Sequence, residues 1–220
     1  MLLPLVVAMA SAASLALTAQ SVPEGSPAGT SVKFTLDFPA SNPEHYSIDI
    51  WANGRAVYDS LARLTDDAGS AEMFHWDFEI PAASRERVFA LAQAASFFSG
   101  KLESGRKLAF TGKKTLEYED GKSASTGTYN YSDLHSIQEL TVYFQSVSQT
   151  LELVRRLDYD QRYQKLALDA DLKNVEAQMA DKQLAELQAA APVLEKIAAD
   201  AAVVKVARAR AQRLLEISKP

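Results

Sequence analysis

Apolar and polar residues alternate through the first half of the chain, a pattern typical of β-strands that bury one face. The alternation recurs in six segments, at residues 32–38, 46–50, 55–60, 74–80, 107–119 and 123–131. Asn53-Gly54 and Asp120-Gly121 each lie between two such segments, and both dipeptides favour tight hairpin turns. The pattern therefore predicts a mostly antiparallel sheet of about six strands.

A helical period separates the fourth and fifth of these segments. Pro81 begins it, and Val88, Leu91 and Ala95 then recur at spacings of three and four, which places them on one face of a helix. Ser99-Gly100 ends this helix, as glycine often does. One helix covering a sheet predicts an α+β domain over residues 31–132.

In the second half of the chain the spacing of apolar residues is helical throughout. A narrow seam contains Ile137, Leu140, Phe144, Val147, Leu151 and Val154, and the same phase resumes at Leu168. Between the two runs, the seam positions Asp158, Gln161 and Lys165 are polar. The unbroken phase favours one long helix over residues 133–182, and the alternative is two helices with a break near residues 158–160.

The last segment, residues 183–220, has the pattern of a C-terminal helical hairpin. Pro192 suits the first turn of a helix, and apolar stripes lie on both sides of Asp200. The pattern of Pro192, Val193, Leu194, Ile197, Val204, Ala207, Ala211 and Leu214 resembles a single HEAT-type repeat. The seam of the long helix needs a partner, and we expect the hairpin to fold back on it; the alternative is a homodimer through the long helix.

The chain begins with 20 residues that carry no charged side chain. An apolar run followed by small residues is the pattern of a secretory signal peptide, although the usual basic residue at its start is missing. We therefore expect a signal peptide over residues 1–19, a flexible spacer over residues 20–30, and export to the periplasm or the extracellular space. The alternative is an uncleaved N-terminus, which would then be the only part in contact with a membrane.

The composition excludes several kinds of site. The chain has 220 residues, a formal net charge of −5 and no cysteine. Without cysteine there is no disulfide, no thiolate nucleophile and no cysteine-held zinc or iron–sulfur site. The acidic balance disfavours a general nucleic-acid binder, because such proteins need many cationic contacts with phosphate.

A series of landmarks spans residues 34–151. In order, they are Tyr46-Ser47-Ile48-Asp49-Ile50, Gly54, Val57-Tyr58, Ile80-Pro81, Phe97-Phe98, Gly121 and Tyr131. This order resembles a family of small exported bacterial domains of unknown function. The resemblance implies a curved sheet with one helix packed across it and an exported location, and it includes no catalytic motif.

The histidines are the first candidates for metal binding or acid–base chemistry. His75 and Asp77 are two apart on a predicted strand, so both point to one face and could supply two metal ligands. A solvent-facing polar stripe is the favoured interpretation, because the residues that alternate with them are aromatic. The sequence contains no nucleophile elbow, phosphate-binding loop or zinc-protease motif, so we predict no catalytic residue and no cofactor.

Two groups of residues could instead form an interaction surface. The most basic stretch contains Lys101, Arg106, Lys107, Lys113 and Lys114. The polar part of the long helix contains Tyr159, Arg162 and Tyr163, and tyrosine and arginine are enriched at protein interfaces. Taken together, the sequence predicts a non-enzymatic interaction or scaffold module of the periplasm or cell envelope, with an unidentified protein or envelope partner. The alternative is a hydrolase or metal-dependent envelope enzyme that uses His75 and nearby carboxylates.

Overall fold

The computed structural model describes residues 29–39, 41–64 and 70–219. The expected signal peptide and most of the expected spacer lie outside these residues. Within these ranges, no helix combines the length and the apolar character needed to cross a membrane.

Six strands form one sheet in the order β4-β3-β2-β1-β5-β6, and every neighbouring pair is antiparallel. The strands are β1 (Ser31–Asp37), β2 (His45–Trp51), β3 (Arg55–Ala62), β4 (Glu72–Glu79), β5 (Lys113–Glu119) and β6 (Ala124–Tyr129). The predicted α+β class and antiparallel sheet are therefore confirmed. One boundary was wrong: the fifth strand begins at Lys113 rather than at residue 107, directly after Gly112, whose φ of +99° suits a turn.

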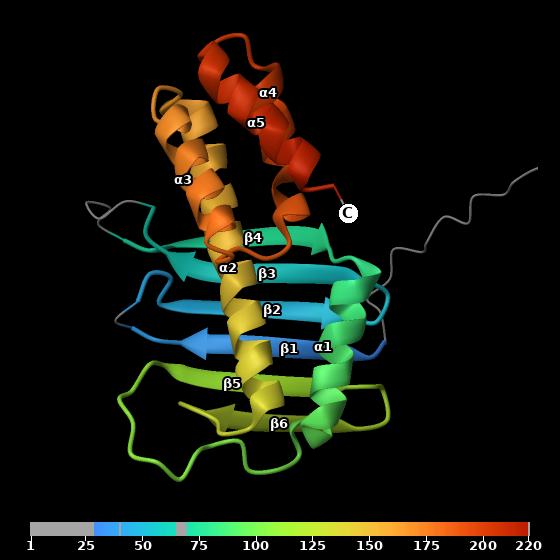
Figure 1. The fold of residues 1–220 in the computed structure, drawn as a ribbon. Coiled ribbons are helices and arrows are strands. Elements are labelled where there is room, and N and C mark those ends of the chain that lie inside the picture. Colours follow the sequence, from blue (N-terminus) through green and yellow to red (C-terminus); the bar gives the residue numbers. More distant parts are fainter. Residues whose placement is uncertain (1–28, 40, 65–69, 220) are drawn as a thin grey trace, which may run out of the picture.

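The chain also forms five α-helices and two short 3₁₀ turns within the described residues. They are α1 (Ala82–Ala94), η1 (Ser96–Phe98), α2 (His135–Tyr163), α3 (Leu168–Ala180), η2 (Leu187–Ala190), α4 (Ala191–Ala199) and α5 (Lys205–Ile217). Helices α1 and α2 lie across one face of the sheet (Figure 1). That face is buried because the strands alternate as expected; on β1, Val32, Phe34 and Leu36 point inward. The rings of Phe34 and Phe144 stack with their centroids 5.0 Å apart and join α2 to the centre of the sheet.

Helix α2 belongs to two layers at once. Its first half crosses the strands, and its second half continues beyond β4, where α3 and α4 pack against it and α5 packs against α3 and α4 (Figure 1). The buried residues of the sheet face and of these helices form one hydrophobic cluster. The long helix and the terminal helical hairpin of α4 and α5 are both confirmed, and the hairpin folds back on the seam of α2, where Leu151 and Val154 are buried.

The predicted extent of the long helix was wrong, because α2 ends at Tyr163 and not at residue 182. Gln164 has φ −136° and ψ 49°, which is outside the helical region, and α3 then packs back against α2. The break lies a few residues after the alternative site near residues 158–160. The seam that could have joined two copies is thus covered by helices of the same chain.

The polar seam positions explain where α2 stops. Gln161 Nε2 donates to Asp200 Oδ2 over 3.2 Å, and Lys165 Nζ lies 2.6 Å from the same oxygen. Asp158 lies 3.6 Å from Lys196 Nζ of α4. These polar residues therefore hold the end of α2 against α4 and Asp200, and the helix ends among them.

Candidate functional site

The structure brings His75 and Asp77 together on the open face of the sheet, as their spacing predicts. His75 Nε2 lies 3.1 Å from Asp77 Oδ2, and His75 Nδ1 lies 2.7 Å from Asp59 Oδ1 on the neighbouring strand. Arg55 NH2 donates to the other oxygen of Asp77 over 3.1 Å. The hydrogen bond to Asp59 is the main reason that the pKa of His75 is raised, and Asp77 adds to this effect.

This arrangement suits an imidazolium between two carboxylates better than a metal ligand. A ligating histidine needs a ring nitrogen with a free lone pair, and here both nitrogens face carboxylates. Among the described residues, no group of three or more His, Cys, Asp or Glu side chains is arranged to hold a metal ion. His45 pairs with Asp37 and His135 with Glu139, each at an exposed position.

The expected basic surface lies near the loop before β5, and it contains one residue fewer than predicted. Lys101, Lys107 and Lys113 are exposed, and exposed Arg106 pairs with Asp133 and stands over the ring of Tyr131. Lys114 is only 4% exposed, so its assignment to this surface was wrong. Its Nζ lies 2.9–3.4 Å from the carbonyl oxygens of three loop residues, Thr111, Gly112 and Asn130. Burial lowers the pKa of this amine.

Lys114 therefore stabilises the loop, and removing its ammonium group should cost stability. We expect Lys114→Met to lower the free energy of unfolding by about 1–2 kcal/mol, because three carbonyl oxygens lose their donor. Urea denaturation followed by circular dichroism measures this change. Lys113→Met, at the exposed neighbouring position, is the matched control, and an equal loss in both variants would contradict the assignment.

The aromatic and basic residues near the end of α2 remain at the surface in part. Tyr163 is exposed, and its ring centroid lies 5.0 Å from that of half-buried Tyr159. Arg162 pairs with Asp158 in the preceding turn. These contacts are local to one helix end.

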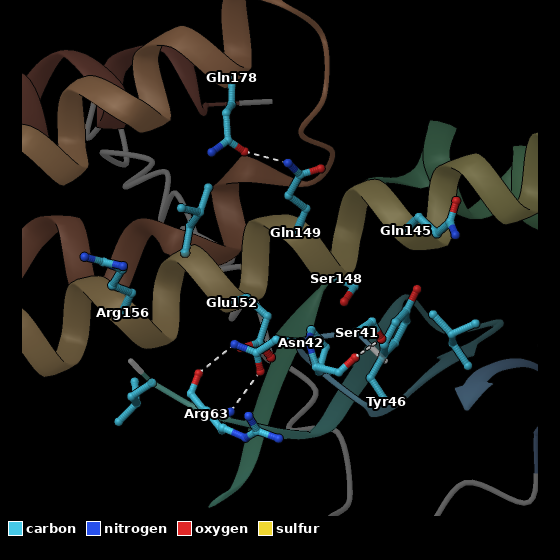
Figure 2. A pocket seen from close by; sticks show the side chains of 14 residues that line it. Ser41, Asn42, Tyr46, Arg63, Gln145, Ser148, Gln149, Glu152, Arg156 and Gln178 are labelled. Carbon is cyan, nitrogen blue, oxygen red and sulfur yellow. Dashed lines mark hydrogen bonds between the residues drawn. The ribbon is translucent and has the colours of Figure 1, made fainter. Parts of the chain in front are cut away.

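A large hollow that the described residues line lies elsewhere, beside α2 on the side away from α1. This α2 cleft has a volume of about 470 Å³ and lies between α2 and the loops that follow β1 and β3 (Figure 2). Its lining includes the polar and charged side chains of Asn42, Arg63, Gln145, Gln149, Glu152 and Gln178. Within its lining, β1 and β2 contribute Leu36 and Tyr46, which are paired across the two strands.

Glu152 forms the base of the cleft and is held by buried hydroxyl groups. Its Oε1 accepts hydrogen bonds from the Tyr58 hydroxyl over 2.8 Å and from Ser60 Oγ over 2.6 Å. Its Oε2 lies 3.7 Å from NH1 of Arg155, whose NH2 donates to the carbonyl oxygen of Ala62 over 3.0 Å. Burial raises the pKa of Tyr58, and the charge of Glu152 raises it further, so the hydroxyl stays protonated. The carboxylate is therefore fixed in position.

The geometry around Glu152 does not suit nucleophilic catalysis. A nucleophile must be within reach of both a base and the substrate. Tyr58 and Ser60 contact the carboxylate, but both are fully buried, so a ligand in the cleft cannot reach them. The arrangement can bind a polar group and orient it.

Amide side chains line the upper part of the cleft, as Figure 2 shows. Gln149 Nε2 donates to Gln178 Oε1 over 2.8 Å, which ties α2 to α3. Asn42 forms two hydrogen bonds with the backbone of Arg63, each 2.9 Å long, and these bonds hold the two loops together. The cleft is thus braced on both sides by side chains that line it.

A pair of acidic residues lies behind the cleft, between α2 and α3. Burial, followed by the hydrogen bond and the charge of Asp171, raises the pKa of Asp160 to about 7. Arg156, which lines the cleft, places Nε 3.1 Å from Asp171 and 3.7 Å from Asp160. Asp160 is only 4% exposed, so its ionisation puts a second charge into a closed space between the helices.

This acid pair predicts a pH-dependent stability. Because the pKa of Asp160 is higher in the folded protein than its ordinary 3.8, the folded state binds the extra proton and loses stability as the pH rises from about 4 through about 7. Asp160→Asn keeps a donor toward Asp171 without the charge, so its free energy of unfolding should not fall in this range. We therefore expect its stability advantage over wild type to grow by on the order of 2 kcal/mol from pH 5 to pH 8. Thermal and urea unfolding at both pH values measure the difference. The exposed Glu195→Gln is the control, and an unchanged difference across this range would contradict the pairing.

The sequence analysis missed the α2 cleft, although one signal for it was present. Gln138, Gln145, Gln149, Glu152 and Arg156 recur at helical spacings and form a polar stripe beside the apolar seam of α2. That stripe indicates an exposed helix face, which is common. Its meaning depends on the loops that face it, and no local pattern places Asn42 or Arg63 there.

Comparison with known proteins adds no assignment. No protein-family model matches the chain, and no curated protein matches it either. The resemblance to small exported bacterial domains therefore stays a prediction.

Proposed function

We propose that this chain is an exported, non-enzymatic interaction module of the periplasm or cell envelope, and that it binds a polar ligand in the α2 cleft. The observation that carries the proposal is the cleft itself. Its volume of about 470 Å³ lies within the range of small-ligand sites, which is roughly 300–1,000 Å³. The uncharged first 20 residues, with their signal-peptide pattern, support the exported location.

The chemistry of the lining supports binding over catalysis. Gln145 and the Gln149–Gln178 pair offer both donors and acceptors, Arg63 and Arg156 offer guanidinium groups, and Leu36, Leu64 and Leu153 add apolar surface. The network of Glu152 holds one wall rigid, and the pair of loops joined by Asn42 holds the other. A preorganised site of this kind binds without the entropy cost of ordering its own side chains.

The proposal replaces one of the reasons for expecting an interaction module. The seam of α2 is covered by the chain's own helices, so it offers no surface for a partner. The cleft is open to solvent and lies on the other flank of the same helix. An interaction role now rests on this cleft.

Filling the cleft should abolish binding. Gln149→Trp places an indole in the opening, and since Gln149 is exposed, the substitution should leave the fold intact. The test is a titration of ¹⁵N-labelled protein with tetraglycine, chitotriose and succinate, which represent amide, sugar and carboxylate ligands. We expect at least one probe at millimolar concentration to shift the side-chain amide signals of Gln145, Gln149 or Gln178, and Gln149→Trp to remove the shifts at the other two residues.

The matched control is Gln93→Trp, an exposed glutamine on α1 that does not line the cleft. It should leave the titration unchanged. If none of the three probes moves these amide signals, or if the shifts persist in Gln149→Trp, the α2 cleft is not a binding site and the proposal is wrong.

A further inference from the structure

A second hollow adjoins the α2 cleft on the other side of Gln145. It has a volume of about 350 Å³, and its lining includes Lys114, Tyr129, Gln138, Val142 and Gln145. Gln145 lines both hollows, so they meet at this residue. Together they form the α2 groove, which follows one flank of the helix from Gln138 to Arg156.

The floor of the α2 groove is a single row of residues across the sheet. Tyr129 of β6 is paired with Lys114 of β5, Lys114 with Leu36 of β1, and Leu36 with Tyr46 of β2. The row lies at the ends of these strands, so α2 forms one wall and the loops beyond the strands form the other. The wall formed by α2 is about 27 Å long at 1.5 Å per residue. An extended polypeptide rises about 3.3 Å per residue, so about eight residues match this length.

The α2 wall presents amide groups at intervals. Among the described residues, the side-chain amide of Gln145 has no hydrogen-bond partner, which leaves its donors and its acceptor available at the centre of the groove. The bond from Gln149 Nε2 to Gln178 Oε1 leaves Oε1 of Gln149 and both hydrogens of Nε2 of Gln178 without a hydrogen-bond partner among the described residues. Every peptide group carries one donor and one acceptor that must both be satisfied when buried. Glutamine side chains carry the same two functions and can satisfy both.

The aromatic residues of the groove argue against a sugar as its main ligand. Sugar rings pack best on an open aromatic face, and the rings of Tyr46 and Tyr129 are only 3% and 4% exposed. The ring of Tyr131 is covered by the guanidinium of Arg106, 5.2 Å from its centroid. The exposed apolar surface consists instead of aliphatic side chains such as Val142, which suit the alternate side chains of an extended peptide.

Charge distinguishes the two ends of the groove. The end next to α3 carries the guanidinium groups of Arg63 and Arg156. The Nε of Arg156 faces Asp171 and Asp160, so Arg63 contributes the larger share of the positive charge that a ligand meets. Among the residues that the structure describes, Glu152 is the carboxylate that lines this end, and its Oε1 is already occupied by two hydroxyl groups. Guanidinium groups bind carboxylates strongly, so this end favours an acidic residue or a free C-terminus.

We infer that the α2 groove binds an extended peptide segment of a partner protein, about eight residues long, with a carboxylate at the Arg63–Arg156 end. The inference rests on the proposed function and names its ligand class. Glutamine side chains of α2 and α3 bind the main chain of the peptide, and its alternate side chains enter the two hollows. The partner is therefore recognised through an unfolded or terminal segment and not through a folded surface.

The test selects phage-displayed random dodecapeptides on the purified protein and measures the affinity of an enriched synthetic peptide by fluorescence anisotropy. We expect enriched peptides to carry Asp or Glu at one end. Gln145→Ala should weaken binding about 3–10-fold, and Gln149→Trp more than tenfold. Arg63→Ala should weaken the acidic peptide but not its amide analogue. Gln93→Trp should change nothing.

Two outcomes overturn the inference. One is that no peptide is enriched; the other is that an enriched peptide binds equally well to wild type, Gln145→Ala and Gln149→Trp. Chitotriose is titrated in parallel, and its result shows whether only the peptide ligand class is wrong or whether the cleft is not a binding site at all. If chitotriose binds wild type and not Gln149→Trp while no peptide binds, the ligand class is wrong and the site stands. If neither a peptide nor any small probe binds the groove, both proposals fail.

Discussion

Replacing Phe144 by alanine is expected to lower the free energy of unfolding by about 3–5 kcal/mol, the range for removing a large buried aromatic side chain. Phe144 is fully buried on α2 and stacks on Phe34 of the central strand, with Tyr143 packed edge-on beside it. Its removal leaves a cavity at the point where the helix and the sheet are joined. Urea denaturation monitored by circular dichroism measures the loss.

Val142→Ala is the control for this substitution. Val142 lies on the same helix, two residues before Phe144, and is 63% exposed, so the loss there should stay within about 0.5 kcal/mol. A loss of that small size at Phe144 as well would mean that the helix is not held by this contact. A large loss at both positions would contradict this assignment, because alanine has a higher helix propensity than valine or phenylalanine and propensity alone would not lower the stability.

Replacing Glu152 by alanine is expected to cost about 2–4 kcal/mol, because it removes the acceptor of two buried hydroxyl groups and the nearest carboxylate to Arg155. Tyr58 keeps a contact with Ser148, 2.9 Å away, so most of the loss falls on Ser60 and Arg155. Calorimetry and urea denaturation both report this change in stability.

Glu152→Gln separates the two causes of this loss. Glutamine keeps a carbonyl oxygen that can accept from Tyr58 and Ser60, but it carries no charge for Arg155. We expect it to recover more than half of the loss, because the contact with Arg155 is long, at 3.7 Å. If Glu152→Gln is as unstable as Glu152→Ala, the charge and not the hydroxyl pair holds the base of the cleft.

The sheet could be predicted because each strand has one buried face and therefore alternates locally. The residues 32–38 and 46–50 carry this signal within single segments, and no knowledge of their neighbours is needed. The position of Lys114 could have been predicted in the same way. It is two residues before the buried Leu116 and so points to the same face. Its positive charge resembles that of its basic neighbours, but its register places it on the buried face of the strand.

The end of α2 could not be predicted from the same kind of pattern. Val154 and Leu168 are 14 residues apart, so two separate helices keep the phase of one. The turn at Gln164 contains neither glycine nor proline, and the residues beside it, Gln161 and Lys165, contact Asp200 far along the chain. The α2 cleft could not be predicted for a related reason. It brings Asn42 together with Glu152 and Gln178, which both follow it by more than 100 positions in the chain.

The central place of β1 has a consequence for how the protein is made. This strand pairs with β2 on one side and with β5 on the other, and Phe34 lies opposite Leu116. During synthesis the first four strands can pair in sequence as hairpins, while the second edge of β1 stays open until β5 has emerged. Until then, β1 presents a row of unpaired N–H and C=O groups to which another strand could pair, and β5 closes this edge before α2 emerges to cover the face of the sheet.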